Sequence, residues 1–159
     1  MGTEKRIAIH LVEHSSWADL VPEDAALLGH AAQAAGRAYA PYSNFHVGAA
    51  LRLNDGTVVE GNNQENASFP AGICAERTAL HAALSMRPSA VVRTIAIVVP
   101  STDRPVTPCG ICRQALLEQE HRQGAPIRVL MAVPDGVVWE LATASDLLPF
   151  SFDPTFLTR

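Results

Sequence analysis

The amino-acid sequence predicts an α/β protein, a three-layer α/β/α sandwich around a five-stranded mixed sheet. Alanine-rich and amphipathic segments that favour helices alternate with segments of β-branched residues that favour strands. Residues 45–53 carry small or apolar side chains at both alternating positions, as expected of a strand that is covered on both faces. Turn signals at 54–56 and 134–136 indicate hairpins. A sheet with helices on both faces accommodates this order of elements.

The first helix and the first hairpin have clear boundaries. Pro22 suits the first turn of a helix, and the residue before Pro41 avoids helical geometry, so we expect a helix over about 22–38. Residues 45–53 and 57–60 follow as paired strands. Residues 1–21 lack a clear period, and we expect them to form an extension to a single domain over 22–159.

The rest of the chain alternates helices with strands. A polar loop over 61–72 leads to a helix over 74–86, whose apolar residues recur at helical spacing. The β-branched segment 93–99 predicts a strand. The remaining expected elements are a helix from Cys109 that ends before Gly124, strands over 127–133 and 137–141, and a short helix from Thr143 or Ser145 to Leu148.

The composition excludes several classes of protein. A hydrophobic content of 48% with 18% charged residues is typical of a globular protein rather than a disordered one. A net charge of −4 disfavours nucleic acid as a partner. No apolar stretch approaches the roughly 20 residues that span a bilayer. Three cysteines cannot all pair as disulfides, so we expect metal-bound thiolates and a cytoplasmic location.

All three cysteines belong to one pattern. Cys74-Ala75-Glu76 precedes Pro108-Cys109-Gly110-Ile111-Cys112, and each group lies where a loop enters a predicted helix. The positive end of a helix favours thiolate over thiol. Three thiolates around zinc leave a fourth position for water, which is the arrangement of a catalytic site. The pattern predicts one Zn²⁺ per chain, held by Cys74, Cys109 and Cys112.

Glu76 is the candidate proton carrier of this site. A carboxylate beside water on zinc can take up its proton, and zinc lowers the pKa of that water to about 7. The alternative is an acid that merely complements the helix dipole. A structural zinc would need a histidine as fourth ligand, and none of the six histidines has a finger-like spacing. Arg77, or less directly Arg113, would offset the negative charge of three thiolates.

Further motifs occur in one order between about residues 36 and 152. They are Ala38-Tyr39-Ala40-Pro41-Tyr42-Ser43, Phe45-His46-Val47-Gly48-Ala49-Ala50-Leu51, Gly61-Asn62-Asn63-Gln64-Glu65-Asn66-Ala67-Ser68, Cys74-Ala75-Glu76-Arg77-Thr78-Ala79-Leu80, Pro108-Cys109-Gly110-Ile111-Cys112-Arg113-Gln114 and Leu147-Leu148-Pro149. Together they resemble the cytidine deaminase family, in its small homotetrameric form with three cysteine ligands. The resemblance implies hydrolysis of cytidine and 2′-deoxycytidine to the uridines and ammonia, by a zinc-bound hydroxide that attacks C4, in pyrimidine salvage.

The resemblance also implies roles for individual residues. Glu76 would shuttle protons, and Arg77 would hydrogen-bond the zinc thiolates and moderate their charge. Asn63 and Glu65 would bind the ribose hydroxyls. The base would be lined by Asn66, Ala67, Ser68, Phe69 and the backbone of Ala75. Phe45 would flank the nucleoside, although it could instead be a core residue at the head of a strand. Phe152, or alternatively Phe150, would reach over the pyrimidine of a neighbouring subunit.

Other functions compete with this interpretation. The blasticidin S deaminases share the zinc motif and act on a modified cytosine nucleoside. A nucleic-acid-editing deaminase would have to grip phosphates, which the acidic composition disfavours. A zinc-stabilised interaction module without catalysis would not need Glu76. Cytidine hydrolysis remains the leading hypothesis.

Overall fold

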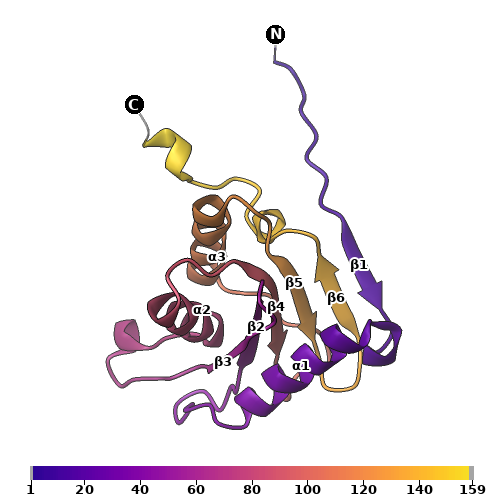
Figure 1. Ribbon diagram of the computed structural model, residues 1–159, viewed down its shortest axis with the longest axis vertical. Helices are drawn as coiled ribbons and strands as arrows, with labels where there is room; N and C mark the ends of the chain where they lie inside the picture. Colours follow the sequence, from indigo (N-terminus) through magenta and orange to yellow (C-terminus); the bar gives the residue numbers. More distant parts are fainter. Residues whose placement is uncertain (1, 158–159) are drawn as a thin grey trace.

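The computed structural model describes residues 2–157, which form a six-stranded sheet between two layers of helices (Figure 1). The helices are α1 (Pro22–Ala35), α2 (Ala75–Met86) and α3 (Gly110–Gln123). The strands are β1 (Leu11–His14), β2 (Gly48–Leu53), β3 (Val58–Asn62), β4 (Val92–Val98), β5 (Arg128–Ala132) and β6 (Val138–Leu141). Short 3₁₀ helices are η1 (Trp17–Asp19), η2 (Phe69–Ala71), η3 (Ala144–Leu147) and η4 (Pro154–Phe156).

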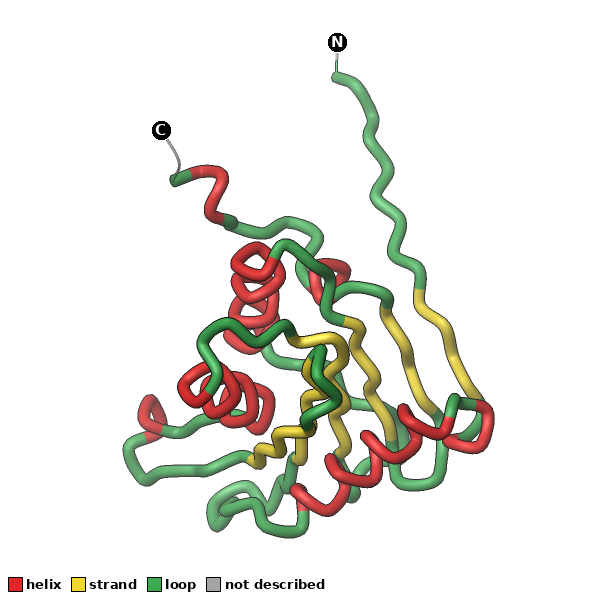
Figure 2. The backbone as a smooth tube through the Cα atoms, viewed as in Figure 1, coloured by secondary structure: helices red, strands yellow, loops and turns green. Residues whose placement is uncertain are grey.

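The sheet is mixed, as predicted, with the order β1-β6-β5-β4-β2-β3. The β4–β5 pair is parallel and the other pairs are antiparallel. The three-layer class is confirmed, but the strand count of five is wrong. The sixth strand is β1, which lies inside the segment expected as an extension and pairs with β6 (Figure 2). Its four residues are too few to show a strand period.

Each layer of helices covers its own core. Leu27 and Leu28 of α1 pack with Val98 and Leu130 on one face of the sheet. The other face packs against α2 and α3 through a second cluster that includes Leu80, Leu116, Ile95, Ile97 and Met131. Burial on both faces explains why most positions of β4 and β5 are apolar. No helix among residues 2–157 is long and apolar enough to cross a membrane.

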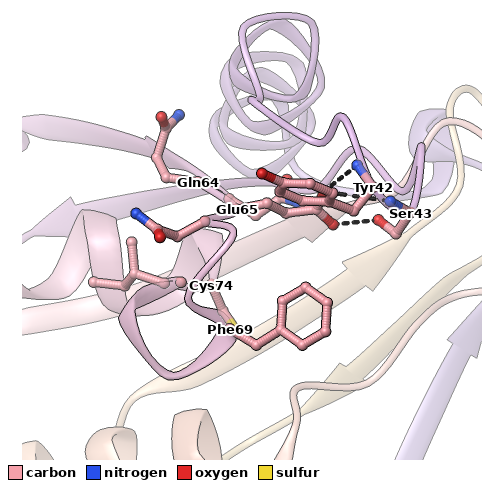
Figure 3. A pocket seen from close by; sticks show the side chains of 10 residues that line it. Tyr42, Ser43, Gln64, Glu65, Phe69 and Cys74 are labelled. Atoms are coloured by element: carbon pink, nitrogen blue, oxygen red, sulfur yellow. Dashed lines mark hydrogen bonds between the residues drawn. The ribbon is translucent and has the colours of Figure 1, made fainter.

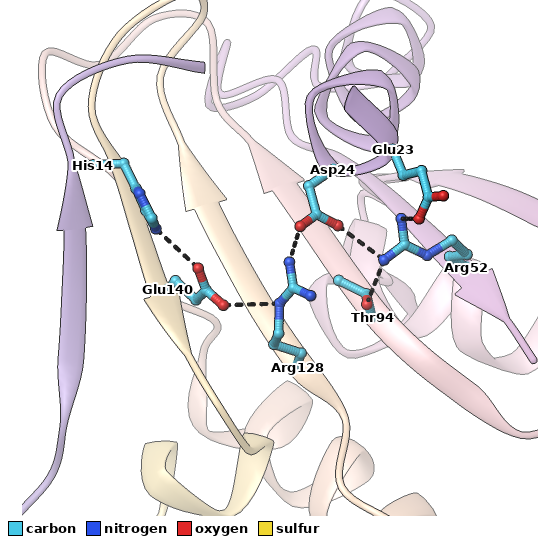
Figure 4. A network of polar contacts seen from close by, with 7 residues as sticks. All are labelled: His14, Glu23, Asp24, Arg52, Thr94, Arg128 and Glu140. Carbon is cyan, nitrogen blue, oxygen red and sulfur yellow. Dashed lines mark hydrogen bonds and ion pairs between the residues drawn. The ribbon is translucent and has the colours of Figure 1, made fainter. Parts of the chain in front are cut away.

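A chain of ion pairs ties α1 and β1 to the sheet (Figure 4). The buried carboxylate of Asp24 on α1 pairs with Arg52 of β2 and Arg128 of β5. Arg128 also pairs with Glu140 of β6, and His14 of β1 hydrogen-bonds Glu140 at 2.9 Å. A buried carboxylate needs such partners, because its desolvation is otherwise costly. The network therefore ties α1 and the edge strand β1 to neighbouring strands on the same side of the sheet.

Gly61 lets β3 approach α2, the helix that follows Cys74. A Cβ atom at Gly61 would lie 2.4 Å from the backbone nitrogen of Ala79 and 2.5 Å from the carbonyl oxygen of Ala75. Both atoms belong to the helix backbone and cannot rotate away. The absence of a side chain at position 61 therefore sets the distance between the sheet and α2.

We expect Gly61→Ala to lower the free energy of unfolding by roughly 1–3 kcal/mol, the usual cost of overpacking a core. Gly29→Ala is the matched control, because a Cβ there meets nothing within 4 Å. That control removes an exposed glycine from the middle of α1, so it should stabilise the protein by roughly 0.5–1 kcal/mol. Urea unfolding followed by circular dichroism measures both. Equal effects of the two substitutions would contradict the packing argument.

Candidate active site

The three cysteines meet at the ends of two helices, as the sequence predicted. Cys74 is the N-cap of α2, Cys109 is the N-cap of α3, and Cys112 lies in the first turn of α3. The Sγ atoms of Cys74 and Cys109 lie 3.8 Å apart, and those of Cys109 and Cys112 lie 3.6 Å apart. A tetrahedral zinc with Zn–S bonds of about 2.3 Å sets its sulfurs about 3.8 Å apart. The cluster therefore fits one Zn²⁺.

The charges at the sulfurs also suit a cation. Hydrogen bonding from Cys112, with smaller contributions from Arg77 and Cys109, lowers the pKa of Cys74 to about 5 although burial opposes this. The hydrogen bond to Cys74 and burial together raise the pKa of Cys112. One thiolate thus forms readily, and it disfavours a second one nearby. A divalent cation removes this repulsion and stabilises all three thiolates.

Glu76 lies beside the sulfurs and is nearly inaccessible, with 5% of its surface exposed. Burial is the main reason that its pKa is raised, and the negative charge of Cys74 adds to this. A hydrogen bond with Cys112 acts in the opposite direction. A carboxyl group in such surroundings holds a proton more readily than an exposed one does. It is suited to take up and release protons.

The two arginines near the cluster differ in their contacts. The pKa of Arg77 is raised by its interaction with the sulfurs of Cys74 and Cys112, although burial lowers it. Its Nε is buried without a hydrogen-bond partner among the described residues. Arg113 instead donates to the carbonyl oxygens of Pro108 and Leu147 at 2.7 and 3.0 Å, and to Thr107 Oγ1 at 3.0 Å. Arg113 therefore holds the loop before Cys109.

A cavity of about 500 Å³ opens beside Cys74 (Figure 3). Its volume is within the range of small-molecule sites. Phe69 lies on one side of it, with 76% of its surface exposed. Its ring contacts the Tyr42 ring edge-on, with 6.0 Å between the ring centroids. The lining residues are Tyr42, Ser43, Asn63, Gln64, Glu65, Asn66, Phe69, Gly72, Ile73 and Cys74.

Glu65 is held at the wall of this cavity by the segment opposite. Its Oε2 accepts hydrogen bonds from the backbone nitrogens of Tyr42 and Ser43 at 2.8 and 3.3 Å, and its Oε1 accepts one from Ser43 Oγ. The bond from the Ser43 side chain is the main cause that lowers the pKa of Glu65, followed by that from Tyr42. Glu65 is therefore ionised and oriented before any ligand arrives, with one lone pair of Oε1 left over.

Asn63 has a structural task besides lining the cavity. Its Oδ1 accepts from the backbone nitrogen of Val47, and its Nδ2 donates to the carbonyl oxygen of Phe45, both at 2.8 Å. The amide thereby fastens the segment before β2 to the end of β3. One N–H and one lone pair of Asn63 remain for a ligand.

The structure places the other predicted residues less directly at the cavity. Ala75 is fully buried behind Cys74, and Phe45 is 37% exposed and outside the lining. Phe152 lies on the C-terminal tail, where its ring stacks on Phe156 at 5.7 Å and its carbonyl oxygen accepts from Gln114 Nε2. Ala67 and Ser68 are exposed and do not line the cavity.

Sequence reasoning gave no role to several residues that shape the cavity. Tyr42 and Ser43 lie in a motif that the sequence analysis named. Their hydrogen bonds to Glu65, however, join residues 22 or 23 positions apart in the sequence. Residues 61–72 were expected to form a loop, and the sequence did not indicate the backbone bridge between Gln64 and Ile73. This bridge positions the chain directly before Cys74. A polar serine after Pro41-Tyr42 was the one available signal.

Comparisons with known proteins agree with this geometry. Residues 22–124 match the family model described as the cytidine and deoxycytidylate deaminase zinc-binding region. A cytidine deaminase of Halalkalibacterium halodurans is 47% identical over 126 residues, which are 79% of this chain and 91% of that protein.

Solved structures give the same result. The crystal structure of cytidine deaminase from Burkholderia pseudomallei matches with a TM-score of 0.71 and 44% identity, over 80% of this chain and 97% of that one. That of cytidine deaminase from Mycobacterium tuberculosis matches with a TM-score of 0.64 and 36% identity, over 83% and 98%. With three thiols arranged for zinc and a buried glutamate beside them, the chain belongs to the zinc-dependent cytidine and deoxycytidylate deaminase family.

Proposed function

We propose that this protein hydrolyses cytidine and 2′-deoxycytidine to uridine and 2′-deoxyuridine with release of ammonia. The observation that carries the proposal is the buried carboxyl of Glu76 beside a three-sulfur cluster, one sulfur of which borders a cavity of about 500 Å³. The relatives named above are cytidine deaminases, which favours the ordinary nucleoside over blasticidin S. We assign the enzyme to pyrimidine salvage, because its proposed products are uridine nucleosides.

The proposed mechanism assigns each step to a residue of this chain. Cys74, Cys109 and Cys112 hold Zn²⁺, which when bound supplies a Lewis acid that makes water nucleophilic near neutral pH. Glu76 takes a proton from the attacking water and passes it to the ring nitrogen N3. It then takes the remaining hydroxyl proton and gives it to the leaving amine, so that ammonia departs. Its burial keeps bulk water from competing for these protons.

The sugar is assigned to the far wall of the cavity. Glu65 keeps a free lone pair for a ribose hydroxyl, and Asn63 keeps one donor and one acceptor. Asn66 and Phe69, which lie between Glu65 and Cys74 in the sequence, also line the cavity. We assign them to binding of the nucleoside. Ala75, which is buried, would then support this wall from behind. The more exposed residues would lie at its rim, namely Phe45, Ala67 and Ser68.

A panel assay of ammonia release tests the substrate. Cytidine and 2′-deoxycytidine should be hydrolysed, whereas cytosine and blasticidin S should be poor substrates. Faster turnover of blasticidin S than of cytidine would replace the proposal with the modified-nucleoside alternative. The use of three thiolates suits a reducing compartment, so we assign the enzyme to the cytoplasm.

We expect metal analysis to find one zinc per chain. The cluster is the one group of three or more potential ligands among the described residues, so no second site competes. Cys112→Ala removes its fully buried sulfur and should lower the zinc content to below about a tenth, since each lost ligand strongly weakens binding. Ser151→Ala, a small change on the C-terminal tail, serves as the control. Full zinc content in Cys112→Ala would contradict the assignment.

We also propose a homotetramer in which Phe152 of one subunit completes the cavity of another. The C-terminal tail stands away from the domain (Figure 1). Phe152 on this tail is 60% exposed, and its carbonyl oxygen accepts a hydrogen bond from Gln114 Nε2. We expect light scattering to give four times the chain mass of 17.0 kDa. Phe152→Ala should raise KM for cytidine more than Phe150→Ala does. A fully active monomer would defeat the proposal.

A further inference from the structure

Residues 2–10 form an extended arm that continues beyond strand β1 and stands away from the domain (Figure 1). The arm leaves the sheet because Leu11 pairs with Leu141, the last residue of β6, so earlier residues have no strand beside them. No backbone group of residues 2–10 hydrogen-bonds another described residue. Ile7, Ile9, Leu11 and Val12 are each about half exposed.

The side chains of the arm alternate between the two faces of the sheet. Glu13 accepts a hydrogen bond from Trp139, which packs on the α2 and α3 side, whereas His14 contacts Glu140 of the ion-pair network on the α1 side (Figure 4). Successive residues of an extended strand point to opposite faces. One face of the arm and β1 therefore carries Lys5, Ile7, Ile9, Leu11 and Glu13.

We propose that residues 4–14 pair antiparallel with the same residues of a second copy of this chain, about a two-fold axis at Ile9. The outer edge of β1 is free, because β1 ends the sheet. Exposed edges with unpaired backbone groups are the usual sites at which strands are added. The pairing would join two sheets into one and satisfy the backbone groups along the outer edge of both arms.

The order of charges selects this register. With Ile9 opposite Ile9 of the partner subunit, Lys5 lies opposite Glu13 of the partner subunit. Ile7 lies opposite Leu11 of the partner subunit, so the shared face has an apolar centre with an ion pair at each end. On the other face, Glu4 lies opposite His14 of the partner subunit, Arg6 opposite Val12 of the partner subunit and Ala8 opposite His10 of the partner subunit, so that this face has one favourable charge pair at each end. Opposite charges and apolar pairs directly across a sheet are stabilising.

Neighbouring registers fit less well. A two-fold axis perpendicular to the sheet keeps each face on its own side, so a residue can lie opposite only a residue of the same face. The nearest alternative registers therefore place the axis at residue 8 or at residue 10. If the axis lay at residue 8, Lys5 would face Leu11 of the partner subunit. If it lay at residue 10, Ile7 would face Glu13 of the partner subunit. Both shifts also separate Lys5 from Glu13 of the partner subunit. The proposed register sets Arg6 opposite Val12 of the partner subunit, but it alone of the three keeps the Lys5 ion pair at each end.

Disulfide trapping tests the register directly. In zinc-loaded Ile9→Cys, the two introduced thiols lie directly opposite, so mild oxidation should give a covalent dimer on a non-reducing gel. Ala8→Cys is the matched control. Its thiols would be displaced diagonally by about 7–8 Å between α-carbons, which is too far for ready bridging. Equal yields in both variants, or no dimer in Ile9→Cys, would overturn the proposal.

A charge exchange supplies the second arm of the test. Lys5→Glu in the Ile9→Cys background sets like charges opposite at both ends and should reduce the initial rate of dimer formation roughly fivefold. Adding Glu13→Lys should restore that rate. An unchanged rate in Lys5→Glu, or no recovery in the double exchange, would also count against this pairing. None of these residues lines the cavity, so failure here leaves the proposed deaminase activity untouched.

Discussion

Glu76→Gln is expected to reduce cytidine turnover by about 10²–10⁴-fold, the usual contribution of general acid–base catalysis. The amide has nearly the shape of the carboxyl and still fits the buried site, but it cannot accept and return a proton. The fold and the three zinc ligands should remain intact, because Glu76 is not needed as a ligand. Ammonia release under saturating cytidine measures the effect.

The control for this substitution is Glu23→Gln, which makes the same change at an exposed residue of α1 on the opposite side of the sheet. Its turnover should equal that of the wild type. Zinc content and far-ultraviolet circular dichroism must match across all three proteins for the comparison to be valid. A zinc-loaded Glu76→Gln protein with near-normal turnover would rule out Glu76 as the proton carrier.

The second large effect concerns the sugar. Free cytosine has the same reacting carbon as cytidine, yet its kcat/KM should be lower by about 10⁴–10⁵-fold. A site built to hydrogen-bond a hydroxyl rejects an analogue that lacks it to this degree, because its polar groups are then left without partners. Glu65 has this character, since Tyr42 and Ser43 hold its carboxylate in place before a ligand binds.

Glu65→Ala should lower kcat/KM for cytidine by about 10–150-fold, as expected for a lost hydrogen bond to a charged group. The same substitution should scarcely change the residual hydrolysis of cytosine, which offers no hydroxyl. Glu23→Ala again controls for the loss of an exposed acid. If wild-type protein hydrolyses cytosine as efficiently as cytidine, the assignment of Glu65 to the ribose is wrong.

The sequence predicted most of the helices and strands because their signals are local. Pro22 begins α1 where expected, and Gly124 ends α3 in the left-handed conformation that glycine favours. The cysteine positions at two helix starts were equally readable. Strand β1 was missed because its stability comes from pairing with β6, more than 120 residues away, and from the contact between His14 and Glu140.

The site was readable in its chemistry and less so in its geometry. The residue types at Cys74, Glu76 and Glu65 predict the roles proposed for them above, because few other roles suit these three residues together. The sequence could not show that the amide of Asn63 is already bonded to the backbone at Phe45 and Val47. Nor could it show that Arg113 donates hydrogen bonds to the backbone of a loop instead of offsetting the negative charge of the sulfurs. Both contacts arise from tertiary packing.

The position of the sulfurs has a consequence for folding. Cys74 and Cys109 lie 35 residues apart, and a metal held by both closes a loop that contains α2 and β4. Such a metal cross-link restricts the unfolded chain, and the chain regains the conformational entropy of this loop when the metal dissociates. Above the dissociation constant, each tenfold rise in free zinc stabilises the folded chain by about 1.4 kcal/mol. Free zinc should therefore continue to raise the resistance of the folded chain to proteolysis after the site is saturated and turnover no longer changes.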